Sequence, residues 1–273
     1  MTFHNVRLIG ASVLCFGVGM GAAQAANVSP DVIFGSGNAN GSFTIGTGSF
    51  ASGTVELGLR GKLRFNASNA PENTFNYDGV NSYSFGAGSP TGGASWVSST
   101  TPVWNFEWSI NTDRDDDNTT ALDDLTYQLR LDSDPGAGTN FQTFDPIAVP
   151  STSTPDFADH AIGDNNSVPF DSTTGTGGGS VASDRPSYLS LIANNNVAQN
   201  SWSYEFFNAA GTPLEFFDPT QTGQYTIELE AFDSTGSIAS TSIEVNVVPV
   251  PFSAPLLLGA LGGLVVLRRR KAT

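Results

Sequence analysis

The sequence predicts an all-β protein whose main domain is an antiparallel β-sandwich of the immunoglobulin-like or jelly-roll kind. Several segments alternate apolar and polar residues with a period of two, as half-buried strands do. Between the two ends of the chain, no stretch keeps the 3.6-residue period of an amphipathic helix. Hydrophobic residues make up 39% of the 273 residues and aromatic residues 11%, which is enough to fill a sizeable core.

The predicted strands place their largest side chains on one face. In residues 103–110, Trp104, Phe106 and Trp108 share the face that is expected to enter the core, so Glu107 is expected to point outward. One apolar and one polar face per strand is typical of two antiparallel sheets packed face to face. The predicted strands cover 54–65, 103–110, 125–131 and 202–207, and a closing hairpin joins 225–231 to 243–247.

We expect this domain to cover residues 27–248, interrupted by loops. Residues 171–187 are mostly Gly, Ser and Thr, which predicts a long surface loop. A division into two β-subdomains near 150–187 is the alternative organisation.

Residues 1–26 have the pattern of a secretory signal peptide. Arg7 supplies the positive start, an apolar stretch follows from Leu8, and Ala23 and Ala25 fit the small-residue cleavage pattern. The alternative, a first transmembrane helix, fits less well because the apolar run is short. Removal of this segment would take away the single cysteine, which suits an exported protein that does not depend on disulfides.

The C-terminal residues 249–273 have the pattern of a second targeting segment. The motif Val248-Pro249-Val250-Pro251-Phe252 leads into an uncharged apolar run that ends at Leu267, and four basic residues follow. The 17 residues from Pro251 to Leu267 would span about 25 Å as a helix, close to the hydrocarbon thickness of a bilayer. The basic end predicts that the tail keeps its last residues in the cytoplasm and the domain outside.

This order of proline motif, short apolar helix and basic end resembles the PEP-CTERM class of sorting tails, in its VPLPA-CTERM variant. The chain has Val-Pro-Val-Pro-Phe where the variant has Val-Pro-Leu-Pro-Ala. The resemblance implies export across the inner membrane of a Gram-negative bacterium and transient anchoring there. It also implies cleavage by an exosortase-type membrane protease and delivery to the cell surface or extracellular matrix. An ordinary membrane anchor is the alternative.

Charge limits the partners of the mature chain. Without both ends, 6 basic and 26 acidic residues remain, a formal net charge of −20. Such a surface repels nucleic acids and other anionic polymers and attracts divalent cations.

The best ligand candidate is an acidic loop between two predicted strands. Its carboxylates alternate as in a calcium loop, which needs several oxygen ligands on a flexible segment. A solvated acidic loop without a metal is the alternative, since Asn118 stands where such loops have a glycine. The residues that would bind Ca²⁺ are Asp113, Asp115, Asp117 and Asp124.

Catalytic motifs are not evident. Asp156, Asp159, Asp164 and Asp171 surround His160, the only histidine of the mature chain, and an acidic loop explains them without a metal. We therefore expect no enzyme and no catalytic residue, but a structural or interaction protein that contacts extracellular polysaccharide. A glycan-binding module, with Trp96 as an exposed loop aromatic, is the second hypothesis, and a secreted hydrolase with two facing carboxylates is the third.

Overall fold

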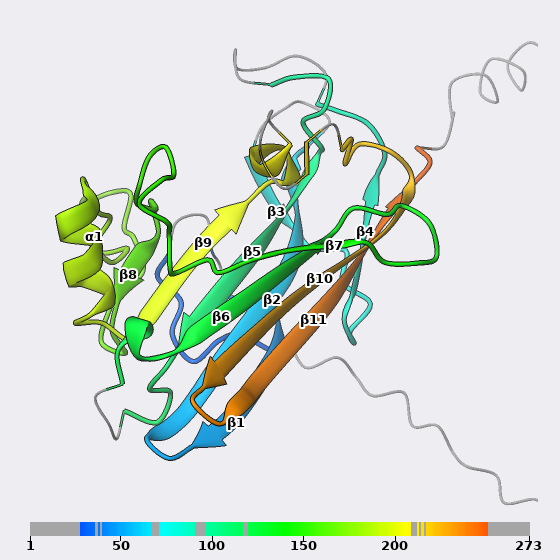
Figure 1. Cartoon of the computed structure of the whole chain (residues 1–273). Helices are drawn as coiled ribbons and strands as arrows, with labels where there is room; N and C mark the ends of the chain where they lie inside the picture. Colours follow the sequence, from blue (N-terminus) through cyan, green and yellow to red (C-terminus); the bar gives the residue numbers. More distant parts are fainter. Residues whose placement is uncertain are drawn as a thin grey trace, which may run out of the picture.

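The computed structural model describes residues 28–35, 38, 40–66, 71–90, 97–116, 120–208, 212, 214–215 and 217–250. Within them the chain is mostly β, with two sheets packed face to face and one α-helix (Figure 1). This confirms the all-β sandwich at the level of architecture. The predicted signal peptide and the C-terminal apolar helix lie outside the described residues.

The first sheet, sheet A, is ordered β1-β2-β5-β9-β8, with β3 paired to β2, and its pairings are antiparallel. Its longest strand, β2, runs through the whole predicted segment 54–65. The strands are β1 (Thr44–Phe50), β2 (Gly53–Phe65), β3 (Pro71–Thr74), β5 (Trp104–Asn111), β8 (Ala161–Gly163) and β9 (Val197–Trp202).

The second sheet, sheet B, is ordered β4-β11-β10-β6-β7. The predicted closing hairpin is confirmed as β10 and β11, while β4 lies parallel to β11 on its other side. Both sheets contain strands from before and after the 150–187 region. The strands are β4 (Ser82–Gly86), β6 (Thr126–Asp132), β7 (Phe141–Phe144), β10 (Gly223–Asp233) and β11 (Gly236–Val248).

The core lies between the sheets and is rich in aromatic rings. Trp104 and Trp108 of β5 are fully buried, as their alternation predicts. Trp104 packs on Tyr204 and Tyr225 at ring separations of 5.2 and 5.9 Å. Offset and tilted pairs of this kind stabilise a core beyond the area that they bury.

The prediction that Glu107 points into solvent is wrong. Glu107 lies on the face of β5 opposite the tryptophans, but this face is also covered, and its side chain is fully buried. It pairs across the strands with Arg60, whose Nε lies 2.6 Å from Glu107 Oε2, and with Lys62, whose Nζ lies 2.6 Å from Oε1. Both faces of sheet A are therefore buried at its centre. The period of two separates apolar side chains in the core from charged side chains that are buried on the opposite face.

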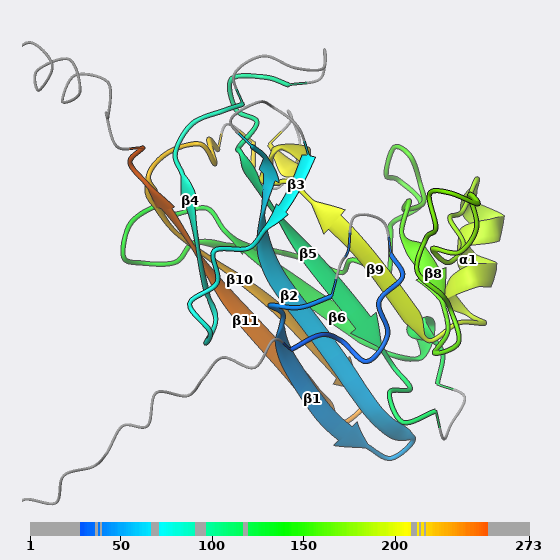
Figure 2. The same cartoon turned by 180° about the vertical axis from the view of Figure 1, so that it is seen from behind.

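Two aromatic rings and a chain segment cover this buried charged layer. The Arg60 guanidinium lies between the rings of Phe43 and Phe75, 4.2 and 4.1 Å from their centres. We call residues 28–35, 38 and 40–43 the N-terminal arm; these described residues lie on the outer face of sheet A before β1 begins (Figure 2). Burial lowers the pKa of Arg60 from its ordinary value, against the opposing effect of Glu107.

Two glycines close one corner of the sandwich. A Cβ on Gly46 would lie 1.9 Å from the Ser240 carbonyl oxygen, and one on Gly48 would lie 1.7 Å from that of Ile238. Strand β1 of sheet A therefore approaches β11 of sheet B backbone to backbone, and only glycine permits this distance.

The predicted strand over 202–207 is wrong beyond Trp202. The chain turns there into a 3₁₀-helix, η2 (Tyr204–Phe207), in which Phe206 N donates to Ser203 O at 3.1 Å. The period of two does not hold in such a turn, so Tyr204 is buried while Phe206 is exposed.

The predicted long loop contains one end of a helix that the periodicity did not indicate. Helix α1 (Arg185–Ile192) begins inside 171–187, where the Asp184 side chain caps the Ser187 amide at 2.8 Å and Pro186 occupies the first turn. The cap and the proline were the sequence signal for it.

Replacement of Glu107 tests the charged layer. Glu107→Ala removes the carboxylate that Arg60 and Lys62 both contact, and breaking a buried ion pair from one side costs about 3–5 kcal/mol. The matched control is Glu228→Ala, which removes a half-exposed partner of Arg130 and should cost under about 1 kcal/mol. Urea unfolding measures both; equal losses would contradict a structural role for the layer.

Candidate functional site

Three connections meet at one end of the sandwich, which we call the acidic end. They are the turn between β1 and β2, the segment from β5 to β6, and the turn between β10 and β11 (Figure 1). The segment from β5 to β6 carries the predicted calcium residues. The acidic end lies at the opposite end of β11 from Val248, where the tail motif begins.

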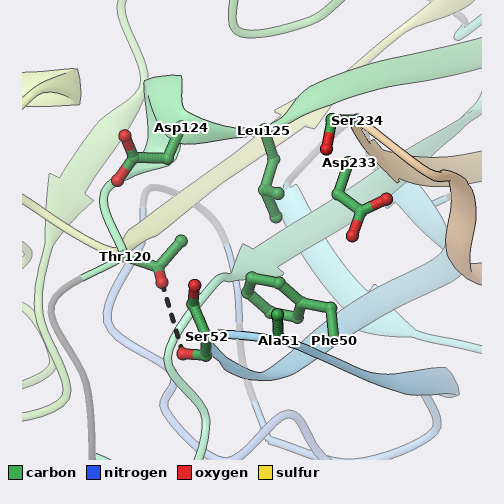
Figure 3. Close-up of a pocket in the computed structure, with 8 residues that line it drawn as sticks. All are labelled: Phe50, Ala51, Ser52, Thr120, Asp124, Leu125, Asp233 and Ser234. Atoms are coloured by element: carbon green, nitrogen blue, oxygen red, sulfur yellow. Dashed lines mark hydrogen bonds between the residues drawn. The ribbon is translucent and has the colours of Figure 1, made fainter.

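A pocket of about 500 Å³ opens among these connections (Figure 3). Two carboxylates, Asp124 and Asp233, come from different walls, and Leu125 lies between them (Figure 3). Their carboxylate groups point away from one another in this view. The lining residues are Phe50, Ala51, Ser52, Thr120, Asp124, Leu125, Asp233 and Ser234.

Both carboxylates accept hydrogen bonds from backbone amides of their own turns. Asp124 Oδ2 accepts from Ala121 N at 2.8 Å, at the start of the short 3₁₀-helix η1 (Leu122–Asp124). Asp233 Oδ1 accepts from the Thr235 hydroxyl and amide, at 2.6 and 2.7 Å, and these bonds lower its pKa. Each of the two carboxylates therefore holds the turn in which it lies.

A second polar pocket lies beside the first, on the other side of Thr120. An amide network supports it: Asn165 Nδ2 donates to Asp113 O at 2.6 Å, and Asn111 Nδ2 and Asn196 Nδ2 donate to Asn165 Oδ1 at 2.8 and 3.1 Å. Three separate loops are joined in this way. The lining residues are Asp113, Asp116, Thr120, Ala121, Asp164, Asn166, Ala193, Asn194, Asn195 and Asn196.

The structure describes three of the four residues of the calcium prediction and places them in different surroundings. Asp113 lines the second pocket, Asp124 lines the first, and Asp115 forms a 3.4 Å ion pair with Arg114. Asp117 lies outside the described residues. In the part of the chain that is described, no three acidic, His or Cys side chains are grouped so that they could hold a metal. Calcium binding stays a prediction.

Sequence reasoning missed the partners of this loop. Asp164 and Asn166 come from beyond β8, and Asn194–Asn196 follow α1. Their runs of Asp and Asn were the only signal, and nothing in the local sequence connects them with Asp113.

A mostly apolar pocket of about 520 Å³ is lined in part by Gly177, Gly178 and Gly179 of the predicted loop 171–187. Ser180 of that loop exchanges two backbone hydrogen bonds with Ile162 of β8, at 2.7 and 2.9 Å. Gly179 has φ +71°, and a Cβ there would lie 2.6 Å from the Phe34 ring. The described lining has no charged side chain and includes Phe170, whose exposed fraction is 60%.

His160 is part of the core, although Asp159 beside it shares the amide of Asn200 with it. The histidine is fully buried, and its ring packs against Trp108, Trp202 and Tyr188. Its Nε2 lies 2.8 Å from Pro146 O, and its Nδ1 lies 3.1 Å from Asn200 Nδ2. A neutral ring with the proton on Nε2 satisfies both contacts, and burial lowers the pKa of His160 to about 4.

The structure describes the chain from residue 28 to residue 250, so each predicted terminal segment lies wholly or mostly outside it. Val248 is the last residue of β11, and Pro249 and Val250 follow it outside any strand. No helix among the described residues has the length and apolar character needed to cross a membrane. Ala23, Ala25, Trp96, Pro251 and Phe252 lie outside the described residues.

Comparisons with known proteins gave no match: no family model fits the chain, and neither the curated proteins nor the solved structures contain a significant relative.

The buried histidine makes stability depend on pH. The unfolded chain takes up a proton on His160 below about pH 6.5, whereas the folded chain does so only below about pH 4. The free energy of unfolding should therefore fall as the pH drops through this window, by about 3 kcal/mol from this residue. His160→Gln keeps a donor and an acceptor but cannot titrate, so thermal unfolding between pH 7 and 4 should show a smaller fall for the variant. The same pH dependence in both proteins would contradict this assignment.

Proposed function

We propose that the chain is an exported protein of a Gram-negative bacterium that acts at the cell surface or in the extracellular matrix through binding or structure, without catalysis. The observation that carries this proposal is the C-terminal order of proline motif, apolar run and basic end, preceded by a signal peptide pattern at the other end. An exosortase-type membrane protease is the partner that this tail implies.

The end of the folded domain supports the sorting proposal. Strand β11 ends at Val248, and Pro249 cannot donate a backbone hydrogen bond to continue it. Val250, the last described residue of the motif, is 59% exposed two residues after the end of the strand. A membrane protease would meet the motif next to the domain surface.

The carboxylates of the first pocket hold turns, so we assign no acid–base chemistry to them. A fold of the immunoglobulin-like or jelly-roll kind belongs to the proposal, and the closing β10–β11 hairpin favours the immunoglobulin-like form. Such folds present loops at both ends of a rigid sandwich.

The intact mass of the native protein tests the sorting proposal. In separated membrane, surface and medium fractions, we expect the protein outside the inner membrane to begin after residue 26 and to have lost its tail near Pro251. Replacement of Pro249 and Pro251 by Ala should leave the tail attached and the protein in the inner membrane. A full-length tail on wild-type protein at the surface would overturn the proposal, and a tail retained in the inner membrane would indicate an ordinary anchor.

Glycan binding is the second candidate function, and the apolar pocket favours it. An exposed phenyl ring beside a bare glycine backbone offers a flat face on which a neutral sugar ring could stack. The strongly acidic chain would repel an anionic polysaccharide, whereas the described lining of this pocket carries no charge.

Loss of the Phe170 ring tests this second function. We expect the wild-type domain to be retarded in gels that contain neutral dextran, and Phe170→Ala to reduce the retardation at least tenfold. Phe206→Ala is the matched control, since Phe206 is 50% exposed but lies in η2, outside the pocket. Equal retardation of the two variants, or no retardation of the wild type, would contradict glycan binding at this pocket.

A further inference from the structure

The folded domain contains a single lysine, and it is buried beside a carboxylate. The chain has two lysines, Lys62 and Lys271, and Lys271 belongs to the C-terminal tail. Lys62 lies on β2 with only 7% of its surface exposed, and its Nζ is 2.6 Å from Glu107 Oε1. Lysines are almost never buried to this degree unless they are paired, because the ammonium loses its hydration. Buried lysines of this kind serve as nucleophiles in many reactive sites.

An asparagine lies directly opposite this lysine. In the antiparallel pairing of β2 with β5, Lys62 faces Asn105 and Arg60 faces Glu107. Residues that face one another in this way have Cβ atoms about 4.5–5.5 Å apart, on the same face of the sheet. Asn105 and Glu107 also share that face, because side chains along a strand alternate. The amine, the amide and the carboxylate therefore lie together on the covered outer face of sheet A.

The Asn105 amide is buried and only half satisfied. Its side chain is 3% exposed in the full residue measure, and its Nδ2 donates to Ser201 Oγ of β9. In the described part of the chain, its Oδ1 is buried without a hydrogen-bond partner. Buried amide oxygens nearly always have a donor, and an exception calls for an explanation. The side chain that faces this amide across the strands is that of Lys62.

Two cations share the carboxylate of Glu107. Arg60 Nε contacts Oε2 at 2.6 Å, and Lys62 contacts Oε1. Each charge that is removed from water is unfavourable unless an opposite charge compensates it. A reaction that turns the Lys62 ammonium into a neutral amide would leave Arg60 and Glu107 as a one-to-one ion pair.

We infer that Lys62 and Asn105 join through an isopeptide bond, an amide between their side chains, with Glu107 as the proton-transfer group. Glu107 takes a proton from the Lys62 ammonium, and the neutral Nζ attacks Cγ of Asn105. The Nζ–Cγ bond forms and the Cγ–Nδ2 bond breaks. Nζ gives up two protons in all, both pass through Glu107 to Nδ2, and Nδ2 leaves as an ammonium ion. Glu107 ends as the carboxylate that it was at the start, and no co-reactant is needed.

The fold supplies what this reaction requires. Strand pairing holds the amine and the amide at a high effective concentration, and burial keeps competing water away. The product would link β2 to β5 and constrain the unfolded chain as a disulfide does. No disulfide can do so here, because the only cysteine, Cys15, lies in the predicted signal peptide. The inference concerns the folded domain and does not depend on the proposed export route.

Trypsin digestion followed by mass spectrometry tests the bond. Trypsin cuts after Lys62 only when its amine is free, whereas it cuts after Arg60, Arg64 and Arg114 in either case. In the denatured full chain, we expect residues 61–64 to stay uncut and joined to residues 65–114. Their joint mass should be lower than the sum of the two fragments by one ammonia, about 17 Da. An unattached fragment 65–114 in most chains, with Asn105 intact or hydrolysed to aspartate, would overturn the inference.

Three variants separate the chemistry from folding. Lys62→Arg keeps the buried cation, but a guanidinium does not lose its proton, so fragment 65–114 should be released. Glu107→Gln should lower the linked share at least tenfold while circular dichroism shows the β fold retained, and full linkage would overturn the role of Glu107. If Glu107→Gln does not fold, Asn105→Ala leaves the ion pairs in place and should also release the fragment. A linked fragment in Lys62→Arg or Asn105→Ala would contradict the bond.

Arg64→Lys is the matched control. Arg64 lies two residues further along the same face of β2, where its amide donates to Val103 O and its side chain pairs with Glu205. A lysine there has no asparagine opposite it, so trypsin should still cut after residue 64. Linkage through this new lysine would show that any buried amine reacts, which would contradict a site built from Lys62, Asn105 and Glu107.

Discussion

The buried pair of Arg60 and Glu107 is the interaction on which this structure depends. The two residues face one another across β2 and β5, the central part of sheet A. Removing two charges from water is unfavourable unless the ions are paired and enclosed. Lys62 completes the pairing, and the rings of Phe43 and Phe75 enclose the guanidinium. The outer face of the sheet therefore needs a cover, which the arm provides.

This requirement makes the two sheets unlike one another. Sheet B keeps an ordinary half-solvated outer face, on which Arg130 bridges Glu228 and Glu230. The outer face of sheet A carries polar and charged side chains like a solvent-exposed face. It has little contact with water, however, since Gln199 and Glu107 are both fully buried. The sandwich behaves as three layers, and the first residues of the described chain form the third.

The sequence predicted the parts of the fold that local periodicity determines. The alternation in 54–65 and in the closing hairpin located β2, β10 and β11, because one face of each strand enters the core. Alternation could not tell a solvated polar face from a covered one, so Glu107 was misplaced. The cover depends on contacts such as Phe34 with Gln199, which are 165 residues apart. The acidic loop was located, but the amides that support Asp113 come from distant loops and had no local signal.

The position of the last strand has a mechanical consequence. Strand β11 lies between β4 and β10, and the tail continues from its end. A pull on the protein from an attachment at its C-terminus would act along the axis of β11. Such a load strains the ladders on both sides together, in shear, and does not open them one bond at a time. An attachment at the C-terminus would therefore load an inner strand of sheet B, which is the arrangement that best withstands such a pull.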